Sequence, residues 1–119
     1  MINRVLAEGK FPWKFSDVGA LTAFADCRLP QIPREEGILV YQKALGEMVD
    51  RGEEIPSQSI AELCIRAATI WAVEYLRRKI AERLGTSVTA AQVDNLLWQR
   101  ARKLKDSMRP HHRTRTICY

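Results

Sequence analysis

Apolar side chains recur along this chain at the three- and four-residue spacing of helices, and runs that alternate as strands do are few. Residues 38–49 show the helical pattern most simply, and the apolar face there consists of Ile38, Tyr41, Leu45, Met48 and Val49. We therefore predict an amphipathic helix over 38–49 that stops at Arg51-Gly52.

The longest predicted helix runs from about Ser59 to Leu84. Ser59 followed by Glu62 fits a capping box, in which the hydroxyl and the carboxylate each accept a hydrogen bond from a free backbone amide of the first turn. Gly85 fits the C-terminal stop. The first half of this helix carries apolar residues on more than one face, so we expect protein on both sides of it. Two pairs at i,i+4 favour the same helix: Glu62–Arg66 and Glu74–Arg78.

Two shorter elements are predicted before residue 38. Ser16 or Asp17 can cap a helix that carries Leu21 and Phe24 and runs to about Asp26. A helical turn is expected in residues 30–37, because proline fits the first turn of a helix.

The last predicted helix begins at a second capping box, Thr89 with Gln92, and continues to about Lys105. The segment after Pro110 is extended, and its apolar ending predicts that the last residues dock onto the fold. The fold class is therefore all-α, without a substantial sheet.

Composition narrows the class of protein. A chain of 119 residues, 46% apolar and 28% charged, suits one globular domain. No apolar run approaches the length of a membrane span, and the first residues lack the apolar region of a secretory signal. The three cysteines are far apart and outside metal-ligand spacing, which indicates reduced thiols and a cytoplasmic location, with a nuclear one also open.

The net charge of +5 is unevenly placed, because residues 100–119 carry +6 and residues 1–99 carry −1. A basic end suggests a phosphate-bearing partner, either a small nucleotide or a nucleic acid. A solvated basic tail explains the same charge.

Asp26 and Arg28 form the first candidate site, in the segment LTAFADCRLPQ. A carboxylate at the C-terminal end of the predicted helix opposes the helix dipole, so it needs a partner or a function. Pairing with an arginine is one explanation. A catalytic carboxylate beside an apolar pocket, suited to cleaving a glycosidic bond, is the other.

Other candidate groups lie in the tail and among the aromatic residues. Arg113 and Arg115 share one face of an extended tail, where two guanidiniums can hold a phosphate or simply face solvent. The adjacent His111 and His112 make a poor metal site, and we expect no metal. Trp71 and Trp98 fit a core, whereas Trp13, in an aromatic linker, is the better candidate for stacking on a base.

Several segments together resemble one family of proteins. LTAFADCRLPQ looks like a signature of the queuosine salvage family, the queuosine 5′-phosphate N-glycosylase/hydrolases. Further similarity follows in family order through EEGILVY, IPSQS, IRAATIWAVE, VDNLLWQRAR and HRTRTICY. The resemblance covers the C-terminal part of the family domain, with residues 1–14 poorly matched and residues 106–119 forming a basic docking tail. The chain thus reads as a single partial domain, 1–119.

The resemblance implies an all-helical fold similar to that of helix-hairpin-helix DNA glycosylases. It also implies hydrolysis of queuosine 5′-phosphate to release queuine for tRNA, without a cofactor, without a membrane and without direct binding of nucleic acid. Asp26 falls on the catalytic aspartate of the signature, and Cys27 stands where a tyrosine is expected. Arg28, Trp13, Arg113 and Arg115 are then substrate-binding candidates.

Two other hypotheses stay open. In the first, the chain is a non-catalytic module that binds RNA through its basic tail, with an affinity that falls steeply with salt. Alternatively it is an inactive remnant with exposed core surface that tends to associate.

Overall fold

The computed structural model describes residues 16–119, and these residues form one 3-10 turn and four α-helices. The elements are η1 (Val18–Ala20), α2 (Gln31–Glu35), α3 (Lys43–Asp50), α4 (Ile60–Leu84) and α5 (Ala90–Leu104). This part of the chain contains no strand, only an isolated parallel bridge between Glu54 and Arg113. The all-α prediction is confirmed.

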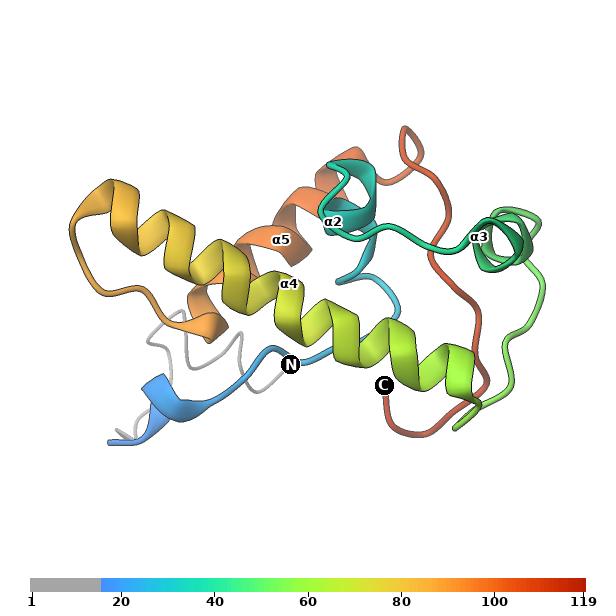
Figure 1. Cartoon of the computed structure of the whole chain (residues 1–119), viewed down its shortest axis with the longest axis horizontal. Coiled ribbons are helices and arrows are strands. Elements are labelled where there is room, and N and C mark those ends of the chain that lie inside the picture. The colour runs from blue at the N-terminus through green and yellow to red at the C-terminus, as the bar shows by residue number, and fades with distance from the viewer. Residues whose placement is uncertain (1–15) are drawn as a thin grey trace.

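Helices α4 and α5 follow one another through a short connection and cross steeply, and the other elements pack against them (Figure 1). The Ser59 side chain caps α4 by accepting the Glu62 amide, and Gly85 ends the helix in the left-handed conformation, at φ 65°. A complete capping box of Thr89 and Gln92 begins α5. The bounds predicted for both helices are confirmed.

The core is divided into two clusters that share α4. The larger lies between α4, α5, α2 and the segment before α2, and its buried members are Ala23, Leu29, Ile32, Val73, Ala90, Val93, Leu97 and Ala101. The smaller lies between α3 and the start of α4, and consists of Val49, Ile55 and Ile65.

The prediction of a helix that runs to about Asp26 is wrong. The structure has only a 3-10 turn there, Val18–Ala20. From Leu21 the backbone is extended, with φ −69° and ψ 138°. The Phe24 amide donates a hydrogen bond of 2.7 Å to Oδ2 of Asp94 on α5. A long-range partner thus takes the amide that a helix would have used.

The helix predicted over 38–49 begins later, at Lys43. The amides of Ile38 and Leu39 both donate to the carbonyl oxygen of Pro33, at 2.8 and 2.9 Å, and so close the end of α2. Those bonds hold residues 38 and 39 against α2, so a new helix starts only after Gln42.

The tail returns along the molecule and docks, as the sequence predicts. It leaves α5, passes α3 and ends beside the first turn of α4 (Figure 1). The Ile55 amide donates to the Arg113 carbonyl oxygen at 2.8 Å, and the Gln31 side chain donates to the Arg109 carbonyl oxygen at 3.1 Å. None of the helices in residues 16–119 is both long and apolar enough to cross a membrane.

Candidate functional site

Asp26 lies in a backbone turn that leads into α2, and its carboxylate organises that turn. Its Oδ1 accepts hydrogen bonds from the amides of Arg28, at 2.9 Å, and Leu29, at 2.7 Å. The Asp26 amide donates to the Phe24 carbonyl oxygen at 2.8 Å, and Phe24 is itself tied to α5 through Asp94. The carboxylate is therefore fixed by α5 on one side and by α2 on the other.

The second carboxylate oxygen, Oδ2, has no hydrogen-bond partner within residues 16–119. Arg28 contributes its amide to Asp26, and no ion pair joins the two side chains in that part of the chain. Pairing with an arginine side chain is therefore not what holds Asp26 within residues 16–119; the backbone amides of Arg28 and Leu29 hold it instead. The two amides thus hold one oxygen of the carboxylate and leave the other without a partner among the described residues.

A hollow of about 320 Å³ lies beside this turn, between Cys27 and the returning tail. It is lined by Cys27, Glu54, His111, His112, Arg113, Thr114, Arg115 and Tyr119. Burial raises the pKa of the Cys27 thiol, and the nearby charge of Asp26 raises it further. Asp26 directly precedes Cys27 in the chain, so its turn adjoins the hollow, although Asp26 is not one of the residues that line it.

A chain of three buried or half-buried side chains holds the tail against α4. The Tyr119 hydroxyl donates to Oε1 of Glu62 at 3.0 Å, and Nε2 of His112 lies 3.1 Å from that hydroxyl. Because the hydroxyl proton goes to Glu62, Nε2 of His112 is the donor to Tyr119, and Nδ1 is unprotonated. Nδ1 is buried and has no hydrogen-bond partner.

The electrostatics agree with this assignment. Burial lowers the pKa of the His112 imidazole, which favours the neutral ring. Burial and the bond to Glu62 raise the pKa of the Tyr119 phenol to about 12. The guanidinium of Arg66 lies 5.4 Å over the Tyr119 ring and 3.6 Å from Glu62, so it balances the buried carboxylate.

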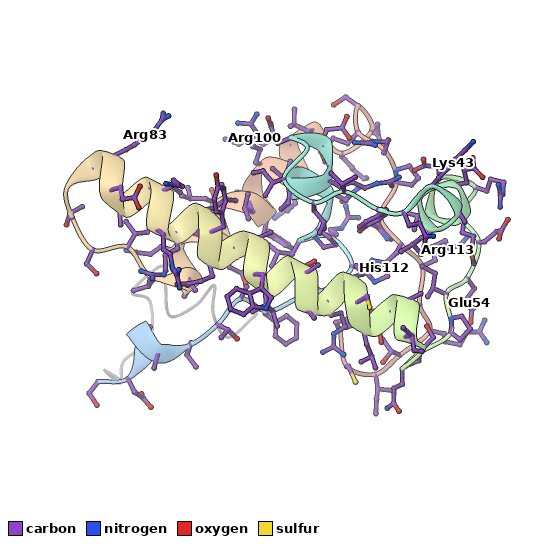
Figure 2. All side chains as sticks on the ribbon, viewed as in Figure 1. Lys43, Glu54, Arg83, Arg100, His112 and Arg113 are labelled. Atoms are coloured by element: carbon purple, nitrogen blue, oxygen red, sulfur yellow. The ribbon has the colours of Figure 1, made fainter. Side chains whose placement is uncertain are left out.

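Arg113 and Arg115 are both exposed and both line the hollow, while Thr114 between them is half-buried. This alternation is the one predicted for the extended tail. Figure 2 shows Arg113 beside Glu54, with His112 close to both. The Arg113 guanidinium reaches the Gly52 carbonyl oxygen at 3.5 Å. Trp13 lies outside the described residues.

Acidic side chains at the C-terminal end of α2, Glu35 and the cap residue Glu36, neutralise part of the basic C-terminal end. Arg100 pairs with Glu36 at 3.0 Å, and Arg109 pairs with Glu35 at 3.2 Å. Arg102 stacks over the ring of Trp98, with 4.8 Å between the guanidinium carbon and the ring centroid. The binding of RNA through this end stays a prediction. Within residues 16–119 no group of three His, Cys, Asp or Glu side chains is arranged to hold a metal ion.

Four residues of this arrangement were not singled out as site residues from the sequence: Glu62, Asp94, His112 and Tyr119. Glu62 is predicted as half of a capping box, yet its second oxygen accepts the Gln58 amide at 3.1 Å while the first serves Tyr119. Asp94 is a lone acid inside an apolar helical run, and this is the one signal in the sequence that marks it.

The fold and the site define an all-α unit with a backbone-held carboxylate next to a hollow bordered by arginines. Such an arrangement suits a protein that binds a phosphate-bearing small molecule. The comparisons with known proteins are specific: a model of the family described as queuosine salvage protein matches residues 4–119. The chain belongs to the queuosine salvage protein family.

Relatives from distant organisms agree with this assignment. Proteins named queuosine 5′-phosphate N-glycosylase/hydrolase are similar to this chain in Sphaerobacter thermophilus, at 52% identity over 88% of the chain, and in Dictyostelium discoideum, at 40% over 94%. The mouse relative of the same name is 36% identical over 94% of the chain. These alignments cover 32%, 35% and 36% of the relatives. The chain thus spans about a third of the length of the curated relatives that it matches.

Proposed function

We propose that this chain forms the aspartate-bearing wall of a site that hydrolyses the N-glycosidic bond of queuosine 5′-phosphate. The names of the relatives support this proposal, since each describes a queuosine 5′-phosphate N-glycosylase/hydrolase. Asp26 also lies in the segment that resembles the family signature.

The observation that carries the proposal is the one-sided anchoring of Asp26. Two amides hold Oδ1, while Oδ2 is without a partner within residues 16–119. A carboxylate fixed in this way cannot turn to relieve an unfavourable charge, so it is preorganised for a cation that develops nearby. The sugar of a nucleotide develops such a charge when its bond to the base breaks.

The reaction can be written with these groups in place. The bond between the sugar carbon C1′ and the base nitrogen breaks, and its electron pair leaves with the base. The Asp26 carboxylate stabilises the positive charge on the sugar and accepts a proton from the attacking water, whose oxygen bonds to C1′. The departing base gains a proton at that nitrogen. This base is a 7-deazapurine and has no N7 to protonate, so stabilisation of the sugar cation carries more of the barrier.

The phosphate of the substrate has a natural partner in Arg113 and Arg115. Both arginines line the hollow together with Cys27, the residue after Asp26. Arginine binds phosphate through two parallel hydrogen bonds, which also orients the sugar. Neutral His112 adds no charge to this group.

The proposal is tested in a chimera in which this chain replaces the matched third of the Sphaerobacter relative. We expect the chimera to release queuine from queuosine 5′-phosphate, measured by mass spectrometry of the free base. Asp26→Asn keeps an oxygen for the amides of Arg28 and Leu29, so the fold is retained. Turnover should nevertheless fall by about 100-fold or more.

Two outcomes contradict the proposal. One is near-full turnover of the Asp26→Asn chimera. The other is a chimera that unfolds cooperatively, as a folded protein does, but releases no queuine. Arg113→Gln combined with Arg115→Gln should raise KM for the phosphorylated substrate and leave KM for the unphosphorylated nucleoside unchanged.

A further inference from the structure

An apolar stripe runs along the outer face of α4 over its first four turns. Its members are Ile60, Leu63, Cys64, Ala67, Trp71 and Tyr75. At 100° per residue these positions fall on one side of the helix, opposite Ile65 and Val73, which face the two cores. The stripe is about 22 Å long at 1.5 Å per residue.

The stripe is exposed to an extent unusual for side chains of this kind. Ile60 is 82% exposed, Trp71 70% and Tyr75 53%. Large aromatic and aliphatic side chains at consecutive turns form a contiguous surface, and such surfaces mark sites of association. The expectation that Trp71 belongs to the core of this chain is therefore wrong.

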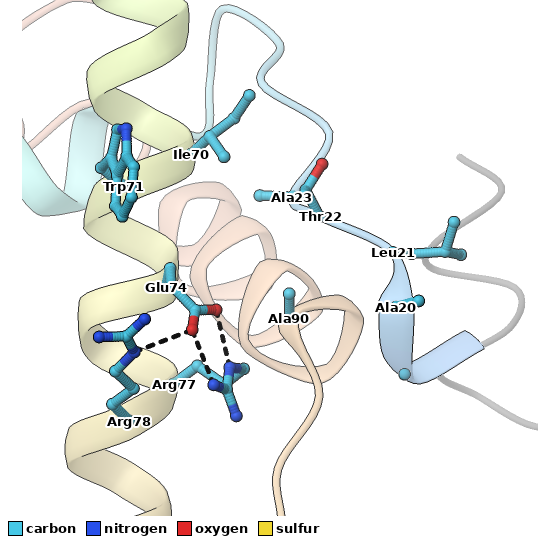
Figure 3. A pocket seen from close by; sticks show the side chains of 11 residues that line it. Ala20, Leu21, Thr22, Ala23, Ile70, Trp71, Glu74, Arg77, Arg78 and Ala90 are labelled. Atoms are coloured by element: carbon cyan, nitrogen blue, oxygen red, sulfur yellow. Dashed lines mark hydrogen bonds and ion pairs between the residues drawn. The ribbon is translucent and has the colours of Figure 1, made fainter. Parts of the chain in front are cut away.

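Two hollows adjoin the stripe, so its surface is not flat. One, of about 390 Å³, is bounded by the loop at Val40 and Tyr41 and by Ile60 and Cys64. The other, of about 480 Å³, lies at Trp71, between α4 and the segment that holds Ala23 (Figure 3). A partner that covers the stripe can therefore insert side chains at both of its ends.

The stripe has a defined polar boundary. After Tyr75 the same side of the helix carries Arg78 and Glu82, and Arg78 donates to Glu74 at 3.0 Å (Figure 3). The hydrogen bonds from Arg77 and Arg78 lower the pKa of Glu74 to about 2, so this cluster is charged at neutral pH. An apolar centre with a charged rim is typical of a protein interface.

We propose that the stripe packs against the part of the queuosine salvage domain that this chain does not match. The chain accounts for 32–36% of the length of its relatives, which leaves about two thirds of a domain without a counterpart here. A helix that is apolar on both faces needs protein on both sides, and the described residues cover only one. The stripe is thus an internal packing surface of the whole domain. This inference rests on family membership and not on the proposed hydrolysis.

The cysteines of the chain allow a direct test. Cys64 lies on the stripe and Cys118 lies on the tail, and both are exposed. In the isolated chain we expect maleimide to label them at rates within about threefold of each other, as measured by peptide mass spectrometry. In the chimera with the Sphaerobacter relative, Cys64 should be labelled at least about tenfold more slowly than in the isolated chain. Each rate is divided by the rate of the same cysteine in denaturant.

The result that overturns the proposal is a folded chimera in which Cys64 reacts as fast as in the isolated chain. Protection of Cys64 that rises with the concentration of the isolated chain, together with a dimer in sedimentation, would instead assign the stripe to a second copy.

A matched pair of substitutions gives a readout that does not depend on labelling. Trp71→Ser should change the melting temperature of the isolated chain by about 2 °C or less, while Val73→Ser, on the buried face, should abolish its cooperative transition. In the chimera, Trp71→Ser should lower the melting temperature by about 5 °C or more. A large loss with Trp71→Ser in the isolated chain would mean that residues 1–15 cover the stripe, and would overturn the proposal.

Discussion

The hydroxyl of Tyr119 donates a hydrogen bond of 3.0 Å to Oε1 of Glu62, 57 positions earlier in the sequence. Glu62 is 1% exposed and lies in the first turn of α4. Together with the stacking of Arg66 on the Tyr119 ring, this contact attaches the tail to the longest helix, and it gives the buried carboxylate one of its partners.

Tyr119→Phe removes that hydroxyl, so Oε1 of Glu62 loses a donor and Nε2 of His112 loses its acceptor. We expect the free energy of unfolding to fall by about 1–3 kcal/mol, because a buried carboxylate loses a hydrogen bond. Urea denaturation measures the change. Tyr75→Phe, the same substitution at a residue that is 53% exposed, is the control and should be nearly neutral. Equal effects of the two substitutions would contradict the importance of the contact.

Asp26 has a structural role that can be separated from its proposed catalytic one. Asp26→Ala removes the acceptor of the Arg28 and Leu29 amides and should cost about 1 kcal/mol of stability, whereas Asp26→Asn should cost little. Thermal unfolding of the two variants of the isolated chain gives the comparison. If alanine is tolerated as well as asparagine, the turn before α2 does not depend on this side chain.

His112 predicts a dependence of stability on pH. Its pKa in the folded chain is lowered by burial, so below the usual value of 6.5 the unfolded chain binds the proton more readily. Stability should therefore decrease as the pH falls through about 6.5 and level off below the folded-state pKa. Tyr119 is hydrogen-bonded to the ring, and the charged groups that act on it are His111, Glu62, Asp26 and Arg66.

Denaturant unfolding between about pH 7.5 and 5.5 measures this dependence. His112→Gln should flatten the curve over this range. His111→Gln should keep most of the dependence and make it slightly smaller, because the charge of His111 adds to burial in lowering the pKa of His112. A curve that keeps its shape in His112→Gln would assign the titration to another group.

Gly46 in α3 tests how firmly the buried Arg34 is held. A β-carbon at position 46 would lie 3.2 Å from Nη2 of Arg34. That guanidinium donates to both Asp50 oxygens, at 2.8 and 3.1 Å, and its carbon stacks 4.6 Å from the centre of the Tyr41 ring. Displacing the Arg34 guanidinium should cost more than the about 1 kcal/mol that alanine gains over glycine in a helix. The net effect of Gly46→Ala should therefore be a loss of about 1 kcal/mol of stability.

A double-mutant cycle with Asp50→Ala checks this explanation. Without Asp50 the guanidinium can move, so Gly46→Ala should become neutral or stabilising in that background. An unchanged loss in the double variant would show that the close approach of Arg34 is not its cause.

The sequence predicts best what neighbouring residues decide. The bounds of α4 and α5 follow from Ser59, Gly85, Thr89 and Gln92, whose caps are local interactions. The turn α2 and the docking of the tail were also predicted. The errors lie where a distant partner takes a backbone group, as Asp94 does with the Phe24 amide.

The candidate site follows the same division. The sequence singled out Asp26, Arg113 and Arg115, and the structure places both arginines on the wall of one hollow with Cys27. It did not indicate that Glu62, His112 and Tyr119 form a buried chain, because their contacts join residues 7 and 57 positions apart. Nor does a pattern of apolar residues show which face of α4 lacks a partner in this chain.

Helix α4 contributes Ile65 to one core and Val73 to the other, little more than two turns apart on a continuous rod. Because both cores pack on the same continuous helix, we expect them to unfold together. Amide hydrogen exchange should then show similar protection in the two halves of the described chain. Any displacement of α4 along its axis would also reach the hollows at both ends of the stripe simultaneously. The rod acts as a mechanical link between the region around Val40 and the region around Ala23.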